Sequence, residues 1–181
     1  MKTTEKQKIS KLLDKENYQE AVSYIEDLLV KSPSDEELLF NHSFIKNYYL
    51  DEISQSIIDE LTKVVDMDGE YKGKALTLLC IVYSESAEFF SAYTAGTDPA
   101  VDHQFLQFVY YEAMGKACFE IGYNHLEEGL SYIDKIIEFE NKFDESIDSY
   151  WYTLQAEAYI RYQQFDNARM KLEKAYEIDG E

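Results

Sequence analysis

The sequence predicts an all-α protein, and three observations support this class. Only 7 Gly and 2 Pro are spread over 181 residues, too few for a protein built from many turns and strands. Leu, Lys, Glu and Ala fill the long stretches between them, and these residues favour helix. Apolar residues also recur at three- and four-residue spacing. With 45% hydrophobic residues, the chain can bury a substantial core, so disorder is not expected.

The helical segments fall into candidate pairs, which predict a single-domain α-solenoid of about four to five antiparallel helical hairpins. The approximate bounds of the five segments are 2–35, 36–69, 70–98, 99–143 and 144–181. One hairpin cannot bury both of its faces, but each neighbour covers the face that the previous hairpin leaves open. Stability is therefore expected to accumulate along the array.

The first pair covers residues 4–31. A short lysine-rich helix is followed by a turn at Glu16 and Asn17, and a second helix begins at Tyr18. Pro33 is expected to end this unit, because proline cannot continue a helix and disfavours helical geometry in the residue before it.

The second pair is expected to begin with a helix over residues 35–50, whose opening acidic residues suit the positive end of a helix dipole. Its second helix carries Ile57, Leu61 and Val64 at helical spacing. Gly69 is expected to supply the stop of this helix.

The central segment is less regular and is expected to contain long helices. Residues 75–95 have no Gly, Pro or Asn where a hairpin turn would fall, which favours one long helix over a broken pair. Asp98 followed by Pro99 is typical of a helix start, and the helix that they open is expected to extend to Ile121. In the partner helix that follows, Gly129 stands where alanine is usual and is expected to keep the two helices close.

The last thirty residues, 152–181, carry the clearest pattern. Small and aromatic residues recur there at the spacing of two short antiparallel helices: Ala156, Tyr159, Phe165, Ala168, Leu172 and Ala175. The pattern resembles the tetratricopeptide repeat (TPR) of about 34 residues, which places a small residue, an aromatic residue and two alanines at these relative positions. The resemblance implies a right-handed superhelix that acts as a protein-binding scaffold.

In the family that this sequence resembles, ligands contact inward-facing positions on the first helix of each pair. Carried over position by position, the resemblance implies a partner-binding set from four repeats: His42, Lys46, Tyr49, Leu76, Tyr83, Glu112, Lys116, Phe119, Thr153, Glu157 and Arg161. The clamp by which co-chaperone members of the family hold the carboxylates of a peptide terminus is not expected, because Ser10 stands where that clamp requires Asn.

Charge limits the kinds of partner. The chain has 36 acidic and 17 basic residues, a formal net charge of −19. A field of this sign repels nucleic acid and anionic membrane and attracts basic proteins or peptides. The alternative is that the acidic residues serve only solubility.

The sequence also predicts where the chain resides. It has no window of about 18 uncharged apolar residues and no apolar stretch behind the lysines at its start, so a soluble cytoplasmic protein is expected. Cys80 and Cys118 lie within apolar helical patterns and are expected to be buried and reduced, with a disulfide as the alternative.

No pattern of catalytic, metal-binding or cofactor-binding residues is recognisable. His42, His103 and His125 stand singly, without an HExxH motif or a His and Cys cluster at metal-ligand spacing. An enzyme is therefore not expected, and no cofactor or metal is predicted.

Three functions remain open. The favoured one is a scaffold that binds a basic or aromatic-rich peptide or protein in a concave helical groove. The second is an acidic chaperone or immunity-type protein that neutralises a basic effector or toxin, and the third is a structural homo-oligomer. No capping helix follows the last hairpin, so its face with Ile160, Leu172 and Tyr176 is expected to be covered by a partner or, in a homodimer, by a second copy.

Overall fold

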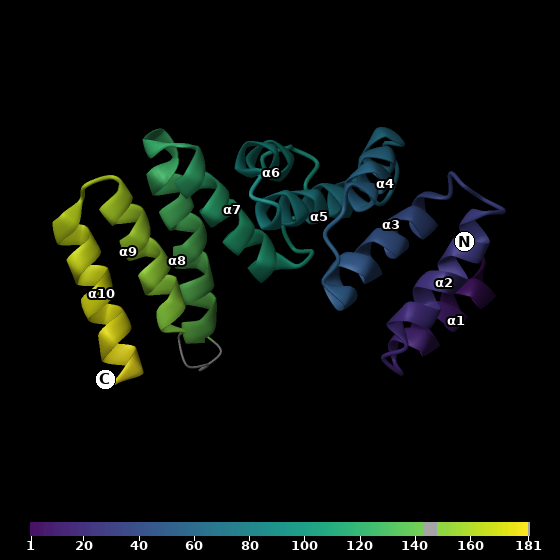
Figure 1. Cartoon of the computed structure of the whole chain (residues 1–181), viewed down its shortest axis with the longest axis horizontal. Coiled ribbons are helices and arrows are strands. Elements are labelled where there is room, and N and C mark those ends of the chain that lie inside the picture. The colour runs from purple at the N-terminus through teal and green to yellow at the C-terminus, as the bar shows by residue number, and fades with distance from the viewer. Residues whose placement is uncertain (143–147, 181) are drawn as a thin grey trace. The chain divides into compact units, whose positions relative to one another are not determined.

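The computed structural model describes residues 1–142 and 148–180, and every regular element in these ranges is a helix (Figure 1). The expected all-α class is therefore confirmed for the described part of the chain. The elements are α1 (Thr3–Leu13), α2 (Tyr18–Leu29), α3 (Glu36–Phe44), the π-helical turn η1 (Ile45–Tyr49), α4 (Gln55–Asp66), α5 (Lys72–Glu85), α6 (Phe89–Gly96), α7 (Gln107–Ile121), the 3₁₀ turn η2 (Tyr123–His125), α8 (Leu126–Lys142), α9 (Ser149–Arg161) and α10 (Phe165–Asp179).

The chain divides into two compact units, Met1–Phe105 and Leu106–Glu181. Within each unit the main helix contacts join elements that follow one another in sequence, from α1 to α6 in the first unit and from α7 to α10 in the second. Each of the five segments proposed from the sequence holds two of the α-helices. Local pairing of this kind lets each helix bury its apolar stripe against its chain neighbours.

The core of the first unit begins where α1, α2 and α3 meet. Ala21 and Ile25 of α2 are fully buried and pack with Ile9 of α1 and Leu38 of α3. Asp35 starts α3 as its N-cap, since its side chain accepts a hydrogen bond from the Leu38 backbone N–H at 3.0 Å.

The second unit is built around the buried apolar face of α8. Leu130, Ile133 and Ile137 form that face, and Phe119 of α7 and Ala158 of α9 pack against it. Gly129 lies at the crossing of α7 and α8: a Cβ atom at this position would stand 2.6 Å from a ring carbon of Phe119. Glycine therefore lets the two helices approach more closely than alanine would.

Three helix pairs share one turn geometry. Glu16, Ala87 and Gln163 each adopt a left-handed conformation, with φ of 58°, 59° and 61°. In each turn the next backbone N–H returns to a carbonyl five residues earlier: Asn17 to Leu12 at 2.9 Å, Glu88 to Tyr83 at 2.8 Å, and Gln164 to Tyr159 at 2.8 Å. This is the Schellman end of a helix, formed here without glycine.

An aromatic residue follows each of these turns. Tyr18, Phe89 and Phe165 are the first residues of α2, α6 and α10, each two positions after the left-handed residue. The first, third and fifth helix pairs therefore share the same left-handed turn, followed by an aromatic residue at the start of the second helix.

The central segment differs from its expected structure in two ways. Residues 75–95 do not form one long helix, because Ala87 closes α5 and α6 begins at Phe89. The helix expected from Asp98 and Pro99 begins only at Gln107. The Asp98 side chain accepts a hydrogen bond from the Ala100 backbone N–H at 2.8 Å and so holds a turn that no helix continues.

The second pair also departs from the sequence prediction at two places. Asp68, with φ of 53°, and not Gly69, takes the left-handed conformation after α4. A Cβ at Gly69 would stand 2.3 Å from the Glu36 carboxylate, so this glycine serves a close approach. The helix expected over residues 35–50 is α-helical only to Phe44 and continues as the π-helical turn η1.

Replacing Gly129 by Ala should destabilise the protein although alanine favours helix. The new methyl group would clash with Phe119 and Cys118, and such overpacking costs about 1–3 kcal/mol, which exceeds the gain of about 1 kcal/mol in helix propensity. Urea unfolding followed by circular dichroism measures the difference. Ser131→Ala, at an exposed position of the same helix, is the control and should be neutral or slightly stabilising. A Gly129→Ala variant as stable as the wild type would contradict the proposed close contact.

Replacing Ala87 by Gly should stabilise the protein by about 0.5–1 kcal/mol. Left-handed geometry costs alanine about 1–2 kcal/mol, and part of the gain is offset because glycine is more flexible in the unfolded chain. The same urea titration tests this, with Ser131→Gly, in a helix interior, expected to be destabilising. Equal losses in both variants would show that Ala87 is not held in the left-handed region.

Candidate partner-binding groove

The hairpin of α9 and α10 is closed by small residues on its inner side. Ala156 of α9 and Ala168 and Ala175 of α10 are all buried, so the two helices pack closely. Asp148 caps α9 by accepting a hydrogen bond from the Tyr150 backbone N–H at 2.9 Å. Both helices are thus fixed at their inner faces, and the remaining apolar residues of α10 point elsewhere.

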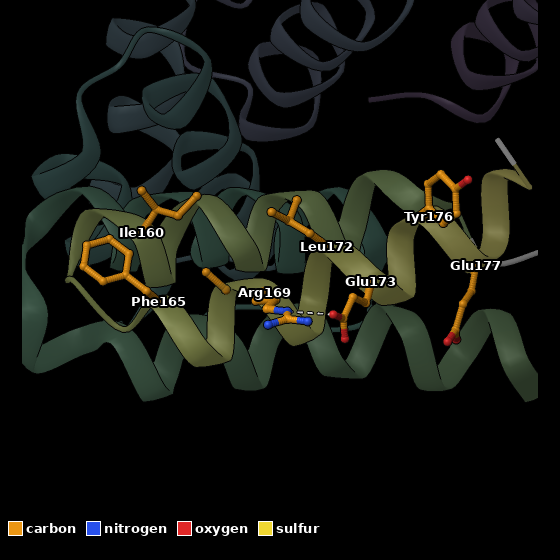
Figure 2. A pocket seen from close by; sticks show the side chains of 8 residues that line it. Ile160, Phe165, Arg169, Leu172, Glu173, Tyr176 and Glu177 are labelled. Carbon is orange, nitrogen blue, oxygen red and sulfur yellow. Dashed lines mark hydrogen bonds and ion pairs between the residues drawn. The ribbon is translucent and has the colours of Figure 1, made fainter.

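These remaining residues line a shallow groove along one face of the hairpin (Figure 2). The groove has a volume of about 670 Å³. Its lining consists of Ile160 at the end of α9 and seven residues of α10: Phe165, Ala168, Arg169, Leu172, Glu173, Tyr176 and Glu177.

The apolar side chains of the groove are unusually exposed. Phe165 is 64% exposed, Tyr176 66% and Leu172 45%. They lie at i, i+7 and i+11 of α10, which places them along one stripe of the helix. No described segment covers this stripe, so water contacts large apolar groups that a neighbouring protein surface could bury.

Charged residues border the stripe. The Arg169 Nε donates a hydrogen bond to Glu173 Oε1 at 2.8 Å, as the dashed line in Figure 2 shows. Lys174, outside the groove, donates to Glu177 Oε2 at 2.8 Å, and this hydrogen bond raises the pKa of Lys174. These pairs are exposed and stabilise the helix only weakly, so both carboxylates can also accept hydrogen bonds from a ligand.

Several residues implied by the tetratricopeptide resemblance come together between α7 and α9. Lys116 pairs with Glu112, and the Tyr150 hydroxyl donates a hydrogen bond to Glu112 Oε1 at 3.3 Å. Arg161 forms an ion pair with Glu120 Oε1 at 2.6 Å and donates to the Phe119 carbonyl at 3.3 Å. The first helices of the fourth and fifth pairs therefore lie alongside each other in the same direction.

The other implied residues of this unit have different surroundings. Phe119 is 3% exposed and belongs to the core, so its side chain is not available to a partner. The Thr153 hydroxyl donates to the Ser149 carbonyl in its own helix at 3.2 Å, while Glu157 is exposed.

In the first unit, His42 is buried, although the resemblance implies that it contacts a partner. Its Nδ1 lies 2.8 Å from Glu60 Oε2, which also accepts a hydrogen bond from the Ser43 hydroxyl at 2.8 Å. Glu26 Oε1 lies 3.4 Å from the other ring nitrogen. His42 of α3 is thus joined to Glu60 of α4 by a partly buried polar contact, while the Glu26 carboxylate of α2 near its other ring nitrogen is 56% exposed.

The remaining implied residues of the first unit are partly or fully engaged. Lys46 pairs with Glu52 at 3.0 Å, and Leu76 is buried. Tyr83 is half-buried. Tyr49 stacks on Tyr18 with ring centroids 4.5 Å apart and stays 36% exposed.

Sequence reasoning identified only part of the groove. It named the face with Ile160, Leu172 and Tyr176 as needing a cover, but it treated Phe165 as a packing residue of the hairpin. The spacing of Phe165 and Leu172, seven residues apart, was the available signal that both lie on the same outer stripe as Tyr176.

Within residues 1–142 and 148–180, no group of three or more His, Cys, Asp or Glu side chains is placed to hold a metal ion. None of the helices in those ranges combines the length and apolarity needed to cross a membrane. Cys80 and Cys118 are buried as expected, and burial, with a smaller contribution from Glu128, raises the pKa of the Cys118 thiol to about 12.

Comparison with known proteins adds no family assignment, since neither a protein-family model nor a curated protein matches the chain.

Acid should weaken the contacts of the partly buried Glu60 carboxylate with His42 and Ser43. Burial alone would raise the pKa of this carboxyl, but His42 and Ser43 together lower it below its usual value of 4.5. A carboxylate with a lowered pKa stabilises the fold above its unfolded pKa and loses that contribution as the pH falls through its folded pKa. Glu60→Gln should therefore be less stable than the wild type at pH 7, and the difference should narrow below about pH 4.5.

Urea unfolding at a series of pH values between about 3 and 7 measures this difference. Glu20→Gln, at an exposed position of α2, is the control and should stay within about 0.5 kcal/mol of the wild type. A difference between Glu60→Gln and the wild type that does not change with pH would show that Glu60 does not titrate with a lowered pKa.

Proposed function

We propose that this protein is a protein-interaction scaffold that binds a partner protein in the groove of α9 and α10. The observation that carries the proposal is the exposed stripe of Phe165, Leu172 and Tyr176 in a chain that is otherwise rich in acidic residues. Contiguous exposed apolar patches with a polar rim are typical of protein-binding sites. Aromatic residues are also enriched in the cores of such interfaces.

The proposal includes a tetratricopeptide-like array as the scaffold. It is supported by the pairing of helices along the chain, by the repeated turn at Glu16, Ala87 and Gln163, and by the parallel first helices α7 and α9. In this proposal a right-handed superhelix presents a concave surface, and exposed members of the implied set, such as Tyr49, Glu157 and Arg161, are further contact positions. The protein acts by binding in the cytoplasm, not by catalysis.

A second candidate function rests on the net charge of −19. An acidic chaperone or immunity-type protein would cover a basic effector and neutralise it, because opposite fields attract the two proteins to each other. Binding of this kind weakens steeply with salt, whereas burial of an apolar stripe does not. A structural homo-oligomer would instead fill the groove with a second copy.

Charge placed in the groove should abolish partner binding without unfolding the protein. Leu172→Asp and Tyr176→Asp put a carboxylate among apolar side chains that are exposed in the free protein, so the fold should be retained. The expected loss is at least about tenfold in captured partner, since a buried unpaired charge in an interface costs several kcal/mol. Capture from extracts of the source cell at low and high salt measures it.

Met170→Asp is the matched control. Met170 is 57% exposed on the same helix but does not line the groove, so this variant should capture the partner as the wild type does. Equal capture by all three variants would contradict binding in the groove. Capture that disappears at high salt in the wild type would favour the neutralising function.

A further inference from the structure

The chain itself shows what covers the second helix of a pair. Within the two units, α3 packs on α2, α5 packs on α4, and α9 packs on α8. In each case the covering element is the first helix of the following pair. α10 is also a second helix, and no described helix covers its groove face.

The cover of α8 shows which side chains such a helix uses. Trp151, Leu154 and Ala158 of α9, at i, i+3 and i+7, pack against the apolar cluster of α8. Beside this apolar contact, α9 donates hydrogen bonds to acidic residues of α8. The Trp151 Nε1–H reaches Glu140 at 2.8 Å, and the Gln155 amide reaches Asp134 at 2.8 Å.

The groove on α10 has the same two components. Phe165, Leu172 and Tyr176 form an apolar stripe, and Ala168, which is only 3% exposed, forms the floor of the groove between Phe165 and Leu172. Glu173 and Glu177 stand at the border of the stripe (Figure 2). On α8, Asp134 and Glu140 are the acidic residues that accept hydrogen bonds from the covering helix. The stripe from Phe165 to Tyr176 is about 17 Å long, or about three helical turns.

We propose that the groove binds an amphipathic α-helix of a partner protein, about three to four turns long, with an apolar stripe flanked by Lys or Arg. This inference rests on the proposed function and specifies the element that is recognised. The apolar stripe of the partner covers Phe165, Leu172 and Tyr176, and its basic residues donate hydrogen bonds to Glu173 and Glu177.

Charge favours a basic partner helix over a second copy of this chain. Two copies would each bring a net charge of −19 to the interface, and their fields repel. A basic helix instead carries positive charge, which the acidic chain and the Glu173 and Glu177 carboxylates at the groove border attract.

The experiment uses three synthetic fluorescein-labelled peptides of about 16 residues and the full chain. The first has Leu and Tyr at i, i+3, i+7 and i+11 with Lys at flanking positions. The second replaces each flanking Lys by Glu, and the third has the composition of the first in scrambled order. Fluorescence anisotropy at physiological salt measures the dissociation constant of each peptide.

The basic amphipathic peptide should bind at least about tenfold more tightly than the other two peptides. Leu172→Asp and Tyr176→Lys should each raise the dissociation constant of this peptide by about tenfold or more, while Met170→Asp should leave it unchanged. The double variant Glu173→Lys and Glu177→Lys should narrow the difference in affinity between the Lys-flanked and the Glu-flanked peptides, because it removes the acidic border of the groove while the chain as a whole stays acidic. Circular dichroism checks that every variant is folded.

Four outcomes would overturn the inference. Equal binding of the scrambled peptide would mean attraction by charge alone, and binding unaffected by both Leu172→Asp and Tyr176→Lys would place the helix elsewhere. A dimer in light scattering that Leu172→Asp dissociates would identify a second copy as the occupant. Groove-dependent capture of a cellular partner without binding of the basic peptide would refute the basic helix while leaving the proposed function intact.

Discussion

The close approach of paired helices at small residues is the constraint on which the rest of the structure depends. Ala21 is fully buried in the first unit, Gly129 admits the ring of Phe119 in the second, and Ala156 and Ala168 close the last hairpin. At these positions a larger side chain would separate the helices, and the apolar stripes on either side would lose their contacts. The two helices of each pair therefore pack closely through one face, and the second helix keeps another apolar face that the next pair can cover.

This arrangement explains why the candidate site lies on α10. Along each unit, an apolar face left by one pair is buried by the first helix of the next, and side-chain hydrogen bonds accompany this contact between α8 and α9. α10 carries the apolar stripe and the acidic border without a covering helix among the described residues. Burial of an apolar helix face by a neighbouring helix thus stabilises each unit internally, and the α10 groove offers the same kind of contact to a partner.

The turns illustrate what local sequence can and cannot reveal. The turn at Glu16 and Asn17 was predictable because both residues are polar and lie between two helical patterns. Ala87 gave no such signal, since alanine favours helix and rarely adopts a left-handed conformation. The free-energy cost of this conformation is offset by the hydrogen bond from the Glu88 backbone N–H to the Tyr83 carbonyl and by the packing of α6 on α5. These contacts form only in the folded chain.

By itself, the sequence determined the helical class, the approximate positions of the helices outside residues 75–106 and several of the small residues at which they meet, because these depend on propensity and on periodicity within one segment. It also marked the face of Ile160, Leu172 and Tyr176 as one that needs a cover, and these side chains are exposed in the chain alone. Tertiary structure decided the rest: His42 and Phe119 became buried and Phe165 turned outward. Whether a residue on a helix faces a neighbour or solvent depends on which segments pack against it, and that is a property of the assembled units.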